Sequence, residues 1–154
     1  MGLTVGDKIP EILGVNQNDK EIKSSDFKGK KLALYFYPKD NTPGCTAEAC
    51  SLRDGHEDLL DGGYHVIGVS VDSKSSHQKF IEKFSLPFEL ISDTDKKLVE
   101  QFGVWQEKTM MGKKYMGTVR TTFLIDENGI IEHIIAGRNI DTKNHAEQIL
   151  GLVK

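Results

Sequence analysis

Cys45 and Cys50 are the only cysteines of the chain and lie five residues apart. The apolar run 32–37 precedes them and is typical of a strand buried on both faces. After Pro43, apolar residues recur at steps of three and four, which predicts a helix. Cys45 therefore falls in the first helical turn, where free N–H groups and the helix dipole favour an anion. Because the thiolate is the reactive form of cysteine, Cys45 is the candidate nucleophile.

The residues just before Cys45 suit the start of a helix. Thr42 is expected to cap the helix with its hydroxyl, and Pro43 fits a first-turn position. Gly44 leaves room for a ligand close to the backbone. The free N–H groups of this turn are expected to hold an oxygen atom of the molecule that the thiolate attacks.

Cys50 is the second candidate, and its distance from Cys45 has a mechanical consequence. In an intact helix, Cα atoms five residues apart are about 8.6 Å from each other. A disulfide needs roughly 7 Å or less, so the two sulfurs can pair only if the helix unwinds locally. A wound first turn would hold Cys45 for attack, and unwinding would bring it to Cys50.

A pair of thiols also suits functions other than attack by Cys45 followed by pairing with Cys50, and the spacing of the two cysteines leaves these functions open. One is a dithiol–disulfide oxidoreductase, although such proteins usually carry Cys-x-x-Cys. Others are a redox-sensing binding module, a domain with structurally inert cysteines, and a metal site. A metal is disfavoured, because zinc sites use shorter spacings and further ligands. The nearest histidine along the chain, His56, is expected to pack or to form a hydrogen bond at the core edge.

The elements around this segment predict the fold. In order we expect a hairpin of 12–15 and 20–22, a strand at 32–37, a helix ending at 62–63, a strand at 64–71, a helix at 73–84, a strand at 88–91, a helix capped by Asp93 or Thr94, strands at 119–125 and 130–136, and a last helix capped by Asp141. Parallel strands joined by helices, followed by an antiparallel hairpin, give a mixed sheet with helices on both faces. The prediction is one α/β domain over 1–154, thioredoxin-like, with an N-terminal β-hairpin extension.

Composition excludes several classes of partner. The net charge is −3 and no basic stripe is present, which disfavours nucleic acid and anionic membranes. The longest apolar runs are too short to cross a bilayer. The segment 1–10 lacks the pattern of a secretory signal, so we expect a cytoplasmic protein, in which cysteines are more often catalytic than structural.

The residues around Cys45 resemble a known family. Pro38-x-x-x-Thr42-x-x-Cys45 is similar to the peroxiredoxin active-site motif, and FYPKDNTPGCTAEAC resembles the peroxiredoxin Q subfamily, also called bacterioferritin comigratory protein. The likeness continues through most of the chain, including 68–72 and 121–126. It implies a thiol-dependent peroxidase for hydrogen peroxide and organic hydroperoxides, acting in antioxidant defence.

The resemblance implies a role for each of five residues. Cys45 matches the peroxidatic cysteine, which becomes a sulfenic acid, and Cys50 matches the resolving cysteine. Thr42 matches the hydroxyl that bonds the thiolate and the peroxide, and Pro38 the residue that shields the pocket. Arg120 matches the arginine that stabilises the thiolate and polarises the peroxide, a task that suits its permanent charge and planar fork of donors.

The resemblance further implies recycling by a thioredoxin-type dithiol reductant and no bound cofactor. Because both cysteines lie in one chain, resolution needs no second subunit, and a monomer is expected.

Further expectations concern the surroundings of the site. Glu48 can pair with Arg120 or Arg53 but is more often solvated at such a position. Asp40 is expected to fix its loop through a turn-type hydrogen bond. A glycine-containing stretch with large apolar residues is expected to fill the core, or else to rim the pocket for alkyl hydroperoxides; its members are Trp105, Met110, Met111 and Met116.

Overall fold

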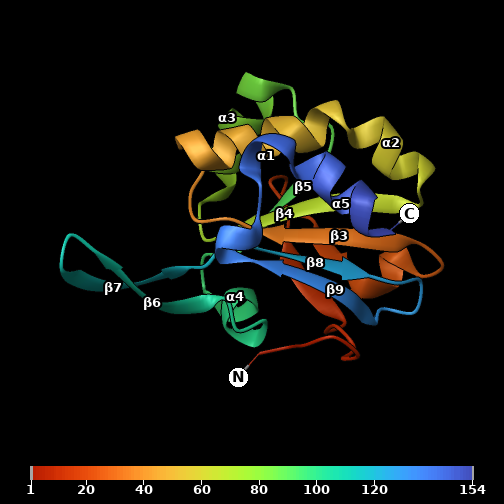
Figure 1. Ribbon diagram of the computed structural model, residues 1–154, viewed down its shortest axis with the longest axis horizontal. Coiled ribbons are helices and arrows are strands. Elements are labelled where there is room, and N and C mark those ends of the chain that lie inside the picture. Colours follow the sequence, from red (N-terminus) through yellow and green to blue (C-terminus); the bar gives the residue numbers. More distant parts are fainter. Residues whose placement is uncertain (1, 154) are drawn as a thin grey trace.

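The computed structural model describes residues 2–153, so Met1 and Lys154 lie outside it. Its centre is a five-stranded sheet with the spatial order β5-β4-β3-β8-β9 (Figure 1). Strands β3, β4 and β5 run parallel, whereas β8 is antiparallel to β3, and β9 to β8. The strands are β3 (Lys31–Phe36), β4 (Tyr64–Ser70), β5 (Glu89–Ser92), β8 (Thr121–Ile125) and β9 (Ile131–Ala136). The predicted mixed sheet is confirmed.

The central strand β3 explains why both faces of the sheet are covered. Successive side chains of a strand point to opposite faces, and here both faces are apolar. Ala33 and Tyr35 enter one core cluster, whereas Leu34 and Phe36 enter the other. Each side chain is at most 1% exposed, so each face must be covered by other elements.

Helices cover one face of the sheet, and α4 lies on the other (Figure 1). The first group is α1 (Pro43–Asp54), α2 (His56–Asp61), α3 (Lys74–Phe84) and α5 (His145–Val153). On the opposite face, α4 (Lys97–Gln101) packs together with the N-terminal hairpin of β1 (Ile12–Val15) and β2 (Glu21–Lys23). This hairpin was predicted. Short 3-10 helices complete the set: η1 (Ser24–Phe27), η2 (Gly137–Asn139) and η3 (Thr142–Asn144).

Two helix starts show how well the capping predictions work. The carboxylate of Asp93 accepts the backbone N–H groups of Leu98 and Val99 at the start of α4, as expected. The carboxylate of Asp141 instead accepts the N–H of Asn144 and caps η3, which precedes α5. Within residues 2–153, no helix is long and apolar enough to span a bilayer.

The structure corrects the expectation for the methionine-containing stretch. Strands β6 (Trp105–Met110) and β7 (Lys113–Thr118) form a separate two-stranded sheet that extends sideways from the body (Figure 1). Met110 is 61% exposed, Met111 98% and Met116 51%. The prediction that they fill the core is therefore wrong, because the hairpin has no layer packed over these side chains.

The helix expected to run from Pro43 to Gly62 is divided at Gly55 into α1 and α2. A Cβ atom on Gly55 would lie 2.5 Å from Cβ of Ala146 in α5. The junction thus contacts α5 at a distance that only glycine permits.

We predict that Gly55→Ala lowers the free energy of unfolding by about 1–3 kcal/mol, because the new methyl group overlaps Ala146. Urea denaturation measures this. The control is Gly151→Ala in α5, where a Cβ atom meets nothing within 4 Å, and where stability should stay equal or rise slightly. Equal stability of Gly55→Ala and the wild type would contradict this packing.

Candidate active site

The loop between β3 and α1 is anchored by the buried carboxylate of Asp40. Its oxygens accept hydrogen bonds from the Tyr37 hydroxyl and from the Ser76 hydroxyl at 2.8 Å, and His77 Nδ1 lies 2.7 Å away. The backbone N–H of Asp40 donates to Asp72 Oδ2 at 2.8 Å. The expected turn-type bond is therefore wrong: Asp40 ties its loop to Tyr37 just after β3, to the segment after β4 and to α3.

The same groups form the one cluster of metal-ligand type among the described residues, since ligand atoms of Asp40, Asp72 and His77 lie within 4.8 Å of one another. Hydrogen bonds within the protein already engage each of them. We therefore interpret the cluster as a structural anchor.

Cys45 lies in the first turn of α1 and is 1% exposed. The first helical bond runs from the N–H of Thr46 to the carbonyl of Thr42. Helix geometry thus leaves the N–H groups of Gly44 and Cys45 without an intrahelical acceptor beside the sulfur.

Thr42 is at the N-cap position, but its hydroxyl does not cap the helix. It donates instead to the carbonyl of Lys39 at 2.9 Å and so closes the loop. The capping prediction for this side chain is wrong, although Pro43 occupies the first turn as expected. Pro38 lies half-buried just beyond the end of β3.

Arg120 connects the sulfur to an acid. It immediately precedes β8, and its guanidinium donates from Nη2 to Cys45 Sγ at 3.4 Å and from Nη1 to Glu48 Oε1 at 2.7 Å. A Cβ atom on Gly44 would lie 3.1 Å from Nη2. The space that Gly44 was expected to leave for a ligand is thus next to the guanidinium, and the sequence-predicted pair of Cys45 and Arg120 is brought together.

Glu48 is 0% exposed, so the expectation of a solvated side chain is wrong. Burial raises its pKa from 4.5 to about 7, and the attraction of Arg120 opposes only part of this effect. Its second oxygen, Oε2, has no hydrogen-bond partner among the described residues. The alternative partner, Arg53, donates instead to Asp54 and to the carbonyl of Phe84.

His145, at the start of α5, faces this orphaned oxygen, with Nε2 3.5 Å from Glu48 Oε2. The side-chain oxygen Oε1 of Gln148 accepts the backbone N–H of Asp141, and it lies 2.9 Å from His145 Nδ1. Because this oxygen is an acceptor, Nδ1 is the ring nitrogen that carries the proton. Burial lowers the pKa of His145, which favours the neutral ring. The single lone pair of Nε2 then accepts the hydroxyl of Thr122 at 2.7 Å, so the ring brings neither a cation nor a hydrogen bond to Oε2 of Glu48.

Sequence reasoning missed His145, because it lies 97 residues after Glu48 and shares no motif with it. Only the packing of α5 on α1 brings the two together.

Burial lowers the pKa of Arg120, but the neighbouring Glu48 and Cys45 outweigh this and raise it above its usual value. The guanidinium therefore stays charged.

Cys50 is half-buried on the same helix, and both cysteines are free thiols. The helix is wound over both of them, which is the state expected to hold Cys45 ready for attack. Immediately after Cys50, the hydroxyl of Ser51 accepts the backbone N–H of Ala146 at 3.1 Å. Helix α5 thus fixes the second half of α1, while the turns before Cys50 lack this contact.

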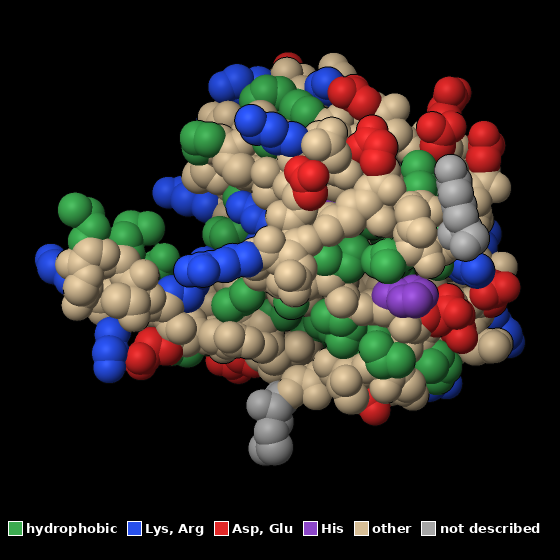
Figure 2. Space-filling model, in the orientation of Figure 1, with side chains coloured by type: hydrophobic (Ala, Val, Ile, Leu, Met, Phe, Trp, Pro, Cys, Tyr) green, Lys and Arg blue, Asp and Glu red, His purple; other side chains and the backbone are tan. Residues whose placement is uncertain are grey.

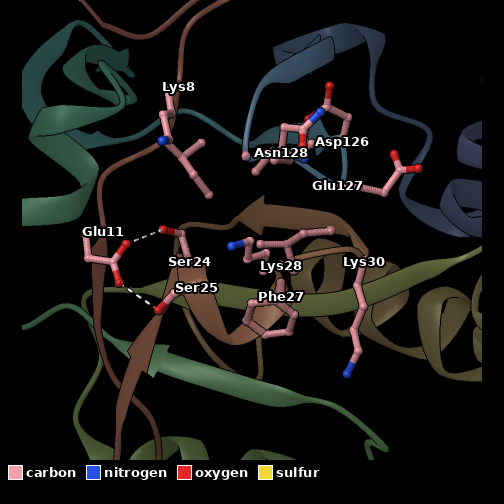
Figure 3. A pocket seen from close by; sticks show the side chains of 14 residues that line it. Lys8, Glu11, Ser24, Ser25, Phe27, Lys28, Lys30, Asp126, Glu127 and Asn128 are labelled. Carbon is pink, nitrogen blue, oxygen red and sulfur yellow. Dashed lines mark hydrogen bonds between the residues drawn. The ribbon is translucent and has the colours of Figure 1, made fainter.

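A hollow of about 370 Å³ lies at the other end of the sheet, where β3 begins and β8 ends (Figure 3). It is lined by lysines and acids, and Glu11 accepts the hydroxyls of Ser24 and Ser25. Since Cys45 follows the opposite end of β3, this hollow is separate from the active site.

His56 contacts Phe88 with ring centres 6.1 Å apart, which confirms that it packs.

Comparison with known proteins identifies the family. Residues 5–134 match the model of the AhpC/TSA family, and the chain belongs to this family. It is 46% identical over 154 residues to peroxiredoxin Bcp of Bacillus subtilis, covering 100% of this chain and 97% of that protein. It is 43% identical to peroxiredoxin Bcp of Escherichia coli K12, covering 99% and 96%.

Solved structures agree with this result. A PrxQ variant of Xylella fastidiosa superposes with a TM-score of 0.88 at 33% identity, covering 99% of this chain and 96% of that one. The bacterioferritin comigratory protein of Xanthomonas campestris gives 0.84 at 30% identity, covering 96% and 97%. The resemblance to peroxiredoxin Q and the thioredoxin-like fold are confirmed, and the chain is a thiol-dependent peroxidase.

We predict that Arg120→Lys slows oxidation of Cys45 by hydrogen peroxide by about 10²-fold, because lysine lacks the planar fork whose two nitrogens bond Sγ and Glu48 separately. Stopped-flow fluorescence measures the second-order rate constant. The control is Arg138→Lys, an exposed position in η2, which should react as the wild type does. A wild-type rate for Arg120→Lys would remove the guanidinium from the reaction.

A second prediction follows from the raised pKa of Glu48, about 7 in the folded chain against 4.5 ordinarily. The folded state holds this proton more tightly, so its contribution to stability is complete below pH 4.5 and is lost as the pH rises through 7. Glu48→Gln removes this loss, on the order of 3 kcal/mol over the interval. Urea denaturation from pH 4.5 to 8 tests it, with Glu57→Gln on the exposed side of α2 as control. Parallel curves for the wild type and Glu48→Gln would contradict the assignment.

Proposed function

We propose that Cys45 is the sulfur that attacks the peroxide and that Cys50 is the sulfur that resolves the product. The observation that carries this assignment is the guanidinium of Arg120, 3.4 Å from Cys45 Sγ at the start of a helix. A cation and free N–H groups at one sulfur favour the thiolate. Cys50 lies outside this group of donors and suits the second role.

The first step is an in-line displacement. The Cys45 thiolate forms an S–O bond with ROOH as the O–O bond breaks, which gives Cys45 sulfenic acid and RO⁻; the latter takes up a proton to become ROH. Negative charge grows on the leaving oxygen, and the donors at the helix start and on Arg120 stabilise it. The substrates are hydrogen peroxide and organic hydroperoxides; reduction of alkyl peroxides by the Xanthomonas campestris relative supports the latter.

Thr42 and Pro38 position the peroxide in this proposal. The Thr42 hydroxyl donates to Lys39, which leaves its lone pairs to accept the O–H of the peroxide. Pro38, half-buried beside the loop, shields the pocket from water and limits over-oxidation.

The second step joins the two sulfurs within one chain. The Cys50 thiol condenses with the sulfenic acid, giving an S–S bond and water. Cα atoms five residues apart in a helix are about 8.6 Å from each other, so the first turns of α1 must unwind. The bond from Ala146 to Ser51 and the contact at Gly55 support confining this unwinding to residues 43–50.

A thioredoxin-type dithiol then returns both thiols by exchange. Because both cysteines belong to one helix, no second subunit is required, which supports a monomer. We assign the protein to the cytoplasm, where reductants keep such thiols reduced.

Cysteine variants test the two roles. Cys45→Ser should lose peroxidase activity entirely, whereas Cys50→Ser should consume one equivalent of peroxide rapidly and then fail to be recycled by thioredoxin. Mass spectrometry after one equivalent of peroxide should show a Cys45–Cys50 disulfide in the wild type and a Cys45 sulfenic acid in Cys50→Ser. Activity retained by Cys45→Ser would overturn the assignment, and normal recycling of Cys50→Ser would give the resolving role to an external thiol.

A further inference from the structure

The β6–β7 hairpin, residues 105–118, is called the arm here. Its strands pair only with each other among the described residues, and Figure 1 shows the arm extending from the side of the molecule. An isolated two-stranded sheet has little core of its own and is marginally stable in water. The arm therefore does not serve to bury the apolar side chains that it carries.

The arm carries four of the eight large apolar side chains that are exposed in residues 2–153. Figure 2 shows hydrophobic side chains gathered with lysines at the far end of the arm. The four side chains are Met110, Met111, Tyr115 and Met116. A group of exposed apolar residues of this kind marks an interaction site, and methionine adapts its shape to a partner.

One face of the arm leads from the active site to its tip. Cross-strand partners point to the same face, and the register pairs Lys108 with Tyr115 and Met110 with Lys113. The side chains of Lys108 and Tyr115 both lie over Gly117. A Cβ atom on Gly117 would lie 3.0 Å from Lys108 and 3.2 Å from Tyr115, so glycine leaves the space that these two side chains occupy. These four side chains thus form one continuous strip.

The inner end of the strip lies near the catalytic charges. The ammonium of Lys108 donates to the carbonyl of Thr118 at 2.8 Å, two residues before Arg120. Burial lowers the pKa of Lys108, and the Arg120 cation lowers it further, whereas Cys45 raises it. Lys108 is therefore within electrostatic range of the guanidinium and of the sulfur.

The charge of the arm is opposite to that of the whole chain. Residues 105–118 contain one glutamate and three lysines, a net charge of +2, whereas the chain carries −3. A basic, apolar and adaptable strip fits an acidic protein surface with an apolar patch.

We propose that the arm is the docking surface for the protein dithiol that reduces the Cys45–Cys50 disulfide; this inference rests on the function proposed above. Reduction requires a partner thiolate to attack one sulfur of the disulfide, forming a mixed disulfide that the second thiol of the partner then releases. Two electrons and two protons thereby pass to Cys45 and Cys50. The base of the arm meets the site, because Lys108 bonds the carbonyl of Thr118 and Arg120, two residues further on, bonds Cys45; a partner bound along the arm is therefore held beside the sulfurs.

Two double variants test the proposal, with thioredoxin, its reductase and NADPH as the probe system. They are Met110→Ser with Met111→Ser, and Lys113→Glu with Lys114→Glu. Each should raise the KM for thioredoxin about tenfold, because exposed contacts and charge attraction are lost. Added salt should raise the KM of the wild type and leave that of the lysine variant almost unchanged.

Neither variant should alter the chemistry of the cysteines. The stopped-flow rate of Cys45 oxidation by hydrogen peroxide and turnover driven by dithiothreitol should match the wild type, and circular dichroism should show the same fold. The matched control is Leu60→Ser with Lys28→Glu and Lys30→Glu, exposed positions at the other end of the sheet; Lys28 and Lys30 are labelled in Figure 3. Its KM for thioredoxin should not change.

Each remaining outcome decides the question. An unchanged KM in both arm variants overturns the proposal, as does an equal rise in the control. A change in sedimentation coefficient without a change in KM would show that the arm binds a second copy, and would overturn it too. Failure of the wild type to turn over with dithiothreitol would refute the proposed function itself. Turnover with dithiothreitol but not with thioredoxin would refute only the docking partner.

Discussion

The guanidinium of Arg120 is the interaction on which the site depends, because it bonds the Cys45 sulfur with one nitrogen and Glu48 with another. This bridge requires β8 to lie antiparallel to β3 in the register that pairs Thr121 with Phe36. That register puts Arg120 just beyond the end of β3, where the chain turns into α1. A Cβ atom at Gly44 would lie 3.1 Å from Nη2 and would crowd this approach. Sheet register, helix start and the Arg120 guanidinium therefore form one geometric unit.

In the reaction that we propose, the same helix has to be rigid for one step and mobile for the next. Asp40 fixes the loop before it through bonds to α3 and to the segment after β4. Helix α5 fixes its later turns through Ser51 and Gly55. The turns between these two anchors hold both cysteines. The fold thus confines the movement needed for a disulfide to a short segment, and unwinding of that segment withdraws Cys45 and Ala49 from the core cluster to which they belong.

The charges around the sulfur are balanced by burial. Arg120 is a single cation that faces both Cys45 and Glu48 in a largely buried site. A thiolate and a carboxylate that share this one cation are costly there, because burial removes the water that would stabilise their charges. The raised pKa of Glu48, about 7, relieves this crowding, and the neutral ring of His145 beside Oε2 adds no charge that would oppose it. The buried acid holds the guanidinium in place without competing fully for its charge.

The sequence by itself predicted the order of the main strands and helices, the mixed sheet and the position of Cys45 at a helix start. Those features follow from local periodicity, from Pro43 and from a motif contained in fifteen residues. It also matched Arg120 to the site through its motif. Only the tertiary structure could show that Glu48 is buried, that His145 faces it, and that Asp40 bonds across to α3, since these contacts join residues far apart in the chain. The exposed arm was misread for the same reason: apolar side chains predict burial only when another layer lies over them.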